Sequence, residues 1–574
     1  MKLFRRTLSL LLVLAFLSTA CVSALAADHN AGTPDEMQTA FADTDTEVNI
    51  NVTANIDMGG APLTANESST YNITTENNYS LNQVSFNGGG TVNVETDITG
   101  NKGDALTTSG KVTVNVTGDI SSDYGDGVCA NDTSNVTVNG NITAEYDGVY
   151  AYDNSNVTVN GNITAEYDGV YANDNSNVTV TGNITAEGDG VYAYGDSNVT
   201  VNGNITAGYD GIDAEDNSNV TVTGNITAED NGVEADDSSD VTVTGNITAV
   251  DNGVEADDYC NVTVNGNITA VDDGVEADDN SNVTVTGNIT AEDDGVYAYG
   301  DSNVTVNGNV SGVDANPEDV DFNNPWSYSE GGDGVIASEN ATVTVTGDVT
   351  GGDAYGTYGY AGSGVIMDST ATVKVGGNAT GGSTNGDQGI NGSGVVIGLY
   401  PTDTPAGSLT VTGYVQGGGD SSDLYIYCET YGEDEEENTL FEDIPVPSIT
   451  LGAMNTIDGE GLTDEELEQI LSQVKITGLK TNEPEVVHTE RAENTMDPFW
   501  QKVLKQVRAA EEGSQLTIDA EYRTSIPTII LQTAAERNIT LIIRWNGGED
   551  ITVDSALELK GNTILLADLA ELVK

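Results

Sequence analysis

Acidic and tyrosine side chains recur at two positions of a repeated sequence unit, and these are the residues that could carry chemistry. Carboxylates fill both positions in four consecutive copies, and tyrosine fills one or both in the copies before and after them. Carboxylate oxygens are ligands for a hard cation such as Ca²⁺, and aromatic rings can stack on sugar rings. The candidate metal ligands are Asp213, Glu215, Glu234, Asp236, Glu255, Asp257, Glu276 and Asp278. The candidate ligand-binding tyrosines of the repeat are Tyr150, Tyr152, Tyr171, Tyr192 and Tyr194.

Both sets of residues also have a structural interpretation. Acidic rows can form a hydrated face that keeps a repeat protein soluble, and tyrosine is a good strand residue. If equivalent residues stack about 4.8 Å apart, like charges repel by about 1 kcal/mol per pair in a water-like dielectric, and a divalent cation would relieve this repulsion. No cofactor is required by either interpretation, and Ca²⁺ is the one cation that the acidic rows suggest.

A unit of 21 residues sets the spacing of these side chains. The triplet Val136–Val138 recurs at Val157 and then at the same interval as far as Val304. Within each unit, three short runs alternate apolar and polar residues, as strands with one buried face require. A single unit cannot bury its inner face, but stacked units can. The sequence therefore predicts a mainly β fold, a parallel β-solenoid of 21-residue coils with three strands each, over residues 45–430.

Side chains at the same place in successive coils would form rows. In the copy that begins near Val157, the residues expected to point inward are Val157, Val159, Ile163, Ala165, Val170 and Ala172. The pattern resembles the right-handed β-helix repeat proteins of bacterial secreted and cell-surface type, roughly over Val48–Gly418. The resemblance implies a right-handed, three-sided coil. It does not fix function, because this fold carries lyases, hydrolases, adhesins and inert stalks.

No catalytic residue is predicted. The residue types of the repeat favour a non-catalytic protein, and an enzyme stays an alternative. The resemblance implies that β-helix lyases use basic side chains, whereas no Lys, Arg or His occurs between Val112 and Val373. Hydrolysis by two carboxylates needs only acids. However, catalysis needs carboxylates in unequal environments, and the acids here repeat from coil to coil. A glycoside hydrolase or other polysaccharide-active β-helix enzyme with paired carboxylates remains the alternative.

Two segments interrupt the repeat and could project from it as loops. The first, Gly312–Gly332, contains Trp326 and Tyr328. The second, Gly351–Gly362, contains Tyr355, Tyr358 and Tyr360. Because loops often carry a repeat protein's specific contacts, these five aromatic residues are further candidates for ligand binding, with packing as the other explanation.

The N-terminal residues have the layout of a secretory signal. A basic start precedes the apolar run Leu8–Leu17, and Ala24 and Ala26 supply small residues before a cleavage site. We therefore predict a signal peptide at 1–26 and a linker at 27–44, with a lipid anchor on Cys21 as the rival interpretation. No later stretch is apolar for the roughly 20 residues that a membrane helix needs, so no membrane insertion is expected in the mature chain. Three cysteines then remain, and an odd number cannot pair completely.

The composition changes near the C-terminus. After an acidic linker at 431–455, a small α/β module is predicted at 456–574, with helices near 464–474, 498–512 and 526–537 and strands at 516–520, 539–545 and 551–553. The residues Phe499–Trp500 and Arg544–Gly548 resemble a module that recurs at the C-terminal end of secreted Gram-positive repeat proteins. That resemblance implies location and modularity only.

The net charge narrows the range of partners. With 17 basic and 92 acidic residues, the formal charge is −75, which argues against nucleic acid and anionic membrane surfaces. Extracellular glycans and cell-surface components stay open as partners. We therefore expect a secreted or cell-surface bacterial protein, non-catalytic, for adhesion or glycan binding and display. The enzyme above and an inert structural spacer are the alternatives.

Overall fold

The computed structural model describes residues 26–573 apart from 316–328, 357, 386–388, 401, 403, 429–443, 461, 463, 478–484, 487–502, 505, 509, 511–512, 521–524, 546–549 and 554–562. The predicted signal peptide lies outside the described residues, as do Trp326 and Tyr328. The chain divides into two units. The first holds residues 1–267 and 280–283, and the second holds 268–279 and 284–574.

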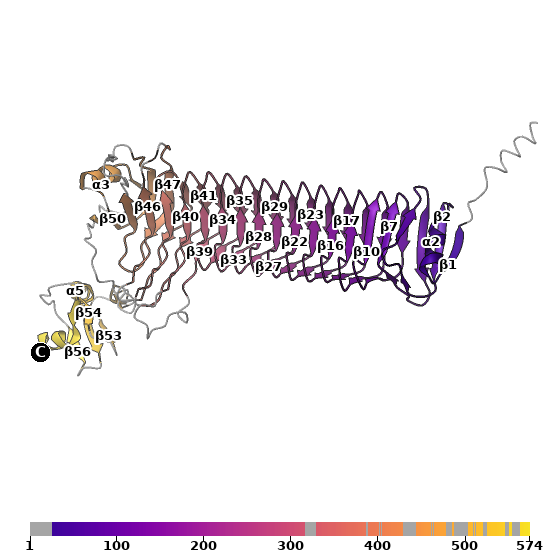
Figure 1. The fold of residues 1–574 in the computed structure, drawn as a ribbon. Helices are drawn as coiled ribbons and strands as arrows, with labels where there is room; N and C mark the ends of the chain where they lie inside the picture. Colours follow the sequence, from indigo (N-terminus) through magenta and orange to yellow (C-terminus); the bar gives the residue numbers. More distant parts are fainter. Residues whose placement is uncertain are drawn as a thin grey trace, which may run out of the picture. The chain divides into compact units, whose positions relative to one another are not determined.

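The first unit is a stack of coils with three strands each, as Figure 1 shows. The first face holds β2 (Glu47–Val52), β5 (Thr70–Thr75), β8 (Thr91–Val94), β11 (Thr113–Val116), β14 (Asn135–Val138), β17 (Asn156–Val159), β20 (Asn177–Val180), β23 (Asn198–Val201), β26 (Asn219–Val222), β29 (Asp240–Val243) and β32 (Asn261–Val264). The second face holds β3 (Ile56–Asp57), β6 (Leu81–Asn82), β9 (Ile98–Gly100), β12 (Ile120–Ser122), β15 (Ile142–Ala144), β18 (Ile163–Ala165), β21 (Ile184–Ala186), β24 (Ile205–Ala207), β27 (Ile226–Ala228) and β30 (Ile247–Thr248). The third face holds β4 (Pro62–Ala65), β7 (Val84–Gly88), β10 (Leu106–Gly110), β13 (Val128–Ala130), β16 (Val149–Ala151), β19 (Val170–Ala172), β22 (Val191–Ala193), β25 (Ile212–Ala214), β28 (Val233–Ala235) and β31 (Val254–Ala256).

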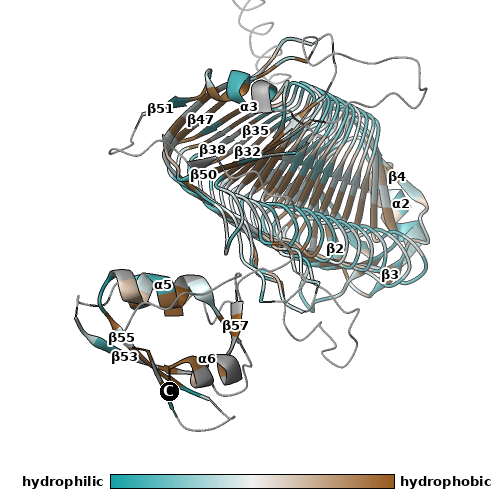
Figure 2. Ribbon diagram, turned by 90° about the vertical axis from the view of Figure 1, so that its left-hand side faces the viewer, coloured by the Kyte–Doolittle hydropathy of each residue, from teal (hydrophilic) through white to brown (hydrophobic). Residues whose placement is uncertain are grey.

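Every coil pairs in parallel with the next, and equivalent residues are in register. Val157 lies opposite Val178, Ile163 opposite Ile184, and Val170 opposite Val191. The predicted inward residues of this coil are all buried, with exposed fractions of 3% or less. Figure 2 shows hydrophobic residues concentrated on the strands and hydrophilic residues on the turns. The prediction of a mainly β parallel solenoid is therefore confirmed.

The second unit continues the same three-faced design with longer coils. Its first face holds β38 (Asn303–Val306), β41 (Thr342–Val345), β44 (Thr372–Val375), β47 (Ser408–Gln416), β49 (Ser448–Ala453) and β51 (Lys475–Ile476). Its second face holds β33 (Ile268–Ala270), β36 (Ile289–Ala291), β39 (Val310–Gly312), β42 (Val349–Thr350) and β45 (Ala379–Thr380). Its third face holds β34 (Val275–Ala277), β37 (Val296–Ala298), β40 (Val335–Ala337), β43 (Val365–Asp368), β46 (Val395–Leu399), β48 (Leu424–Cys428), β50 (Thr456–Glu460) and β52 (Glu485–Val486).

The solenoid pairing extends further toward the C-terminus than predicted. Strand β49 pairs with β47 inside the segment expected to be an acidic linker, and β52 pairs with β50. Helix α3 (Asp464–Leu471) was predicted, but it lies between solenoid strands rather than inside the C-terminal module. The linker prediction was wrong here because the apolar residues of β49, among them Ile449 and Leu451, are buried and complete a further coil.

Residues 27–44 also differ from the predicted linker. They hold β1 (Ala27–Ala31), which pairs in parallel with β2, and helix α2 (Pro34–Phe41). Thr33 caps this helix by accepting the N–H of Glu36, and Pro34 is its first residue. The Phe41 ring stacks on Tyr71 with centroids 4.3 Å apart, and Tyr71 is fully buried. The helix thus covers the apolar interior at the start of the first unit.

The C-terminal module has its own sheet and core. Strand β53 (Gln515–Asp519) pairs in parallel with β55 (Thr540–Arg544), which pairs antiparallel with β56 (Ile551–Val553). A second pair joins β54 (Ser525–Pro527) and β57 (Thr563–Leu565), and the helices are α5 (Thr528–Glu536) and α6 (Leu566–Leu572). Strands β53, β55 and β56 and helix α5 match the predicted ranges closely, whereas β54, β57 and α6 were not predicted. The helix predicted to begin at Pro498 falls largely outside the described residues.

Two further expectations concern cysteines and membranes. Cys129, Cys260 and Cys428 are free thiols, in agreement with an odd cysteine count. Among the described residues, no helix is long and apolar enough to cross a membrane.

Candidate functional site

The predicted tyrosines form a row on the third face of the first unit. Tyr150, Tyr171 and Tyr192 are in register on β16, β19 and β22. Their ring centroids lie 4.8 Å and 4.9 Å apart at successive coils. Tyr152 lies beside Tyr150 at 5.1 Å, and Tyr194 directly follows β22 in the chain. Partial burial, together with nearby charges, raises the pKa of Tyr171 and of Tyr192. These rings are half-buried and neutral, and they present a continuous aromatic strip.

A second set of tyrosines lies at the corner between the second and third faces, and the sequence analysis did not select it. We call this turn the second corner. Its tyrosines are exposed by about half or more, and the rings of Tyr146 and Tyr167 lie 5.3 Å apart. The set is Tyr124 (61% exposed), Tyr146 (48%), Tyr167 (57%) and Tyr209 (61%). In most of these coils, the tyrosine lies two residues before the corner glycine. This spacing is the sequence signal that could have identified the set.

The second corner also carries one aspartate per coil, which we call the corner aspartates: Asp126, Asp147, Asp168, Asp189 and Asp210. Each accepts the backbone N–H at the equivalent position of the following coil through Oδ1, over 2.9–3.2 Å. Although they occupy a turn, these side chains are only partly accessible. They join neighbouring coils by a side-chain hydrogen bond at every step.

Burial raises the pKa of all five corner aspartates, because the charged form loses water, and neighbouring carboxylates raise it further for all of them except Asp168. The pKa of Asp147 is raised to about 7 by burial and then by Asp126 and Asp168. That of Asp189 is raised to about 6 by burial and by Asp168, and that of Asp210 to about 8 by burial and by Glu234.

The predicted acidic row continues the tyrosine row on the same face. Asp213 on β25 lies opposite Tyr192, and Glu234 and Glu255 follow on β28 and β31. Burial and then Glu234 raise the pKa of Asp213 to about 8. In the two coils that carry Glu234 and Glu255, the corner position holds Asn231 and Asn252 instead of aspartate. Asn231 Nδ2 donates to Glu255 Oε2 over 3.1 Å. In these two coils, an acidic residue on the third face is thus combined with a neutral residue at the second corner.

Only part of the predicted metal set comes together. In the first unit, carboxylate oxygens of Asp236, Asp257 and Asp258 lie within 4.8 Å of one another. Glu215 follows β25, with its pKa raised by burial and by Asp236. In the second unit, Glu276 on β34 lies opposite Tyr297 of β37, and Asp278 follows this strand. Asp236 and Asp257 are thus the predicted ligands of the first unit that the structure brings together.

The second predicted loop does not project freely. Tyr360 forms parallel bridges with Glu330 and with Ile390, and the Tyr355 N–H donates to Ser329 Oγ over 2.7 Å. Tyr360 remains 45% exposed, while Tyr355 and Tyr358 are half-buried. The segment is a widened part of stacked coils, so its tyrosines partly serve packing.

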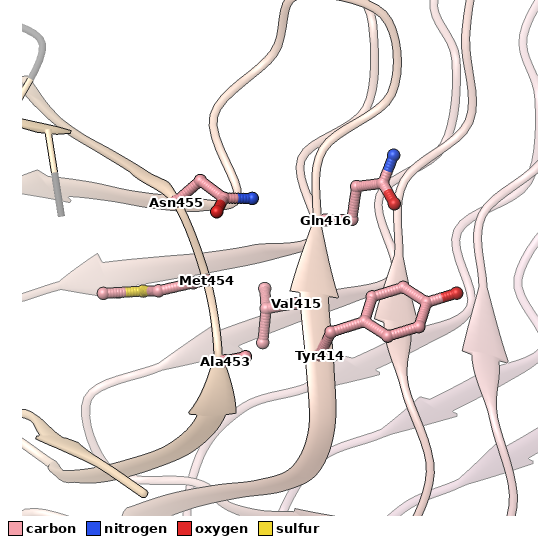
Figure 3. Close-up of a pocket in the computed structure, with 6 residues that line it drawn as sticks. All are labelled: Tyr414, Val415, Gln416, Ala453, Met454 and Asn455. Carbon is pink, nitrogen blue, oxygen red and sulfur yellow. The ribbon is translucent and has the colours of Figure 1, made fainter. Parts of the chain in front are cut away.

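A small hollow lies in the second unit, lined by Tyr414, Val415 and Gln416 of β47 and by Ala453, Met454 and Asn455 (Figure 3). Its volume of about 160 Å³ is below the roughly 300–1,000 Å³ of sites that enclose small-molecule ligands. It contains no acid, base or nucleophile. Extended side-chain rows are therefore stronger candidates for recognition than this hollow.

One comparison with known proteins supports the assignment of the repeat. Residues 168–311 match the family described as the right handed beta helix region. No curated protein and no solved structure matches the chain. Together with the parallel coils of both units, this match supports a right-handed β-helix repeat.

Proposed function

We propose that this right-handed β-helix repeat protein is a secreted or cell-surface bacterial protein that binds or displays extracellular glycans without turning them over. The observation that supports this most is the pair of tyrosine rows around the second corner, one strip in ring contact at 4.8–4.9 Å and one set exposed by 48–61%. Aromatic rings repeated at each coil suit a polymer with a repeated apolar ring face. The negative charge favours neutral glycans over acidic ones.

The carboxylates beside the rings support a non-catalytic role. Each corner aspartate already accepts a backbone N–H of the next coil, so its geometry serves the stack. Asp210 and Asp213 both have a pKa raised to about 8. A carboxylate pair for glycoside hydrolysis needs one protonated and one ionised member near neutral pH. Two similarly raised values do not give that division.

Removal of the strip should weaken glycan retention. We expect the triple variant Y150S/Y171S/Y192S to lose roughly tenfold or more in affinity for a retained neutral polysaccharide, because each ring would otherwise cover apolar sugar surface. Affinity electrophoresis against a polysaccharide panel measures this. Tyr259→Ser is the matched control, since Tyr259 is 61% exposed but lies outside both rows; equal retention by the triple variant and wild type would contradict the strip.

The same panel separates the alternative functions. Release of reducing sugar would favour a glycoside hydrolase. If the Asp213→Asn variant no longer released sugar, the reaction would be assigned to the place where the tyrosine row meets the acidic row. Retention without release supports binding. Neither retention nor release across the panel would favour an inert spacer.

Calcium binding is a second proposal, supported by the proximity of Asp236, Asp257 and Asp258. Oxygen ligands of this kind suit Ca²⁺, and binding to the folded state alone raises its stability. We expect millimolar Ca²⁺ to raise the melting midpoint by about 3 °C over chelator-treated protein, and the triple Asp→Asn variant to lose this rise. A midpoint that chelator leaves unchanged would remove the metal proposal.

A further inference from the structure

The same kind of hydrogen bond joins neighbouring coils at two corners, but the side chain that accepts it differs between them. At the first corner, between the first and second faces, asparagine Oδ1 atoms accept the next coil's N–H, as Asn162 does from Asn183 over 2.8 Å. At the second corner, aspartate Oδ1 atoms accept the equivalent N–H in five successive coils. The bond needs a side-chain oxygen, which a neutral amide supplies equally well.

The second corner itself shows that a neutral side chain fits there. Asn231 accepts the N–H of Asn252 over 3.1 Å, at the position that aspartate fills in the preceding coils. Negative charge at the corner aspartates is therefore not needed for the geometry. A protonated carboxyl keeps one carbonyl oxygen as an acceptor, so the bond survives protonation.

Every titratable group that acts on these aspartates is acidic or neutral. Residues Val112 to Val373 contain no Lys, Arg or His. Ionisation therefore places negative charges at successive coils, about 4.8 Å apart along the stack, and residues 112–373 supply no basic side chain to offset them. The groups that interact with the row are Asp104, Cys129, Tyr150, Tyr171, Asp213, Asp230 and Glu234.

We propose that the corner aspartates form a proton-operated clasp, which holds neighbouring coils together when these carboxyls are protonated and weakens that hold when they ionise. The first-corner asparagines are the part of the stack that does not respond to pH. This role is independent of glycan binding.

The direction of the effect follows from proton linkage. The pKa is raised to about 6 for Asp126 and Asp189, about 7 for Asp147 and about 8 for Asp210, so the folded state holds protons more tightly than the unfolded chain. The resulting stabilisation is complete below the ordinary aspartate pKa of about 4 and is lost as pH rises through about 6–8. Exposed carboxylates ionise near pH 4 and stay charged throughout this window.

The test compares two variants that remove the same number of charges. The clasp variant is D147N/D168N/D189N/D210N, which keeps every acceptor oxygen. The matched control is D132N/D153N/D174N/D196N, at exposed turn residues. Between about pH 5.5 and 8.5 we expect the melting midpoint to fall by about 10 °C in wild type and in the control variant. The fall should be clearly smaller in the clasp variant, in which Asp126 and Asp213 still titrate. An equal fall in all three proteins would overturn the proposal.

A spectroscopic measurement keeps the proposal testable if the clasp variant does not fold. Infrared spectroscopy of the wild type should show protonated carboxyl groups that persist at about pH 6, where exposed carboxyls are ionised. Their disappearance at about pH 8.5 should accompany the loss of thermal stability. Absence of a protonated-carboxyl band at about pH 6 would overturn the proposal.

Discussion

Replacing Gly182 with valine is expected to unfold the coils around it. A Cβ at this position would lie 2.3 Å from the Gly161 carbonyl oxygen of the preceding coil. The backbone of Gly182 is not in the left-handed region, so valine could adopt it; the contact alone forbids the side chain. Because parallel hydrogen bonds fix the spacing of coils, the neighbour cannot move away without losing them. We expect a cost of about 3 kcal/mol or more in the free energy of unfolding, measured by urea denaturation followed by circular dichroism.

Gly103→Val is the control for this substitution. The only contact that a Cβ there would make is with the Gln83 Nε2 atom at 3.2 Å, at the end of a flexible side chain. We expect this variant to change the free energy of unfolding by less than about 1 kcal/mol. If both variants denature at the same urea concentration as wild type, the close approach of neighbouring coils is wrong.

Opening the N-terminal cap should have the second large effect. Phe41→Asp would place a carboxylate where a ring now lies 4.3 Å from Tyr71 and 5.7 Å from Phe86, all three residues being buried. We expect a loss of about 3–5 kcal/mol from the removed ring and the buried charge. The end of a solenoid without its cap exposes apolar interior and an unpaired strand edge. Light scattering should therefore detect aggregation that grows with protein concentration.

Gln38→Asp on the same helix is the matched control. Gln38 is exposed on α2, so the substitution adds the same charge without touching the stacked rings. It should leave both the free energy of unfolding and the scattering unchanged. Aggregation of both variants to the same extent would assign the effect to charge on the helix, and not to the cap.

The fold of the repeat was predictable because the chemistry of a coil is local. Alternation decides which face each side chain takes, and the 21-residue period places Val157 on Val178 and Ile163 on Ile184 without any other information. The tyrosine row followed from the same rule, since Tyr150, Tyr171 and Tyr192 share one place in the coil. The cap and the last coils were missed because they occur once, so no period reveals them.

The backbone angles and the burial of the corner residues could not be predicted from the sequence. A Gly-Asn or Asp-Gly pair signals a turn, but it does not tell which residues of the coil adopt a left-handed backbone. In the structure Gly182 has an ordinary φ, whereas Asp174 and Asn175 have φ of 51° and 63°. The burial of the corner aspartates was equally hidden from the sequence.

The amino-acid sequence by itself thus determined the strands, their inward and outward sides, and the rows that stacking produces, because each depends on neighbours within one coil. Tertiary structure alone decided which turn residues are crowded, buried or shifted in pKa. Those properties depend on atoms of a neighbouring coil. For Gly182, the Gly161 carbonyl oxygen of the preceding coil would lie 2.3 Å from an added Cβ, and for Asp168 the backbone nitrogen of Asp189 in the following coil lies 3.0 Å away.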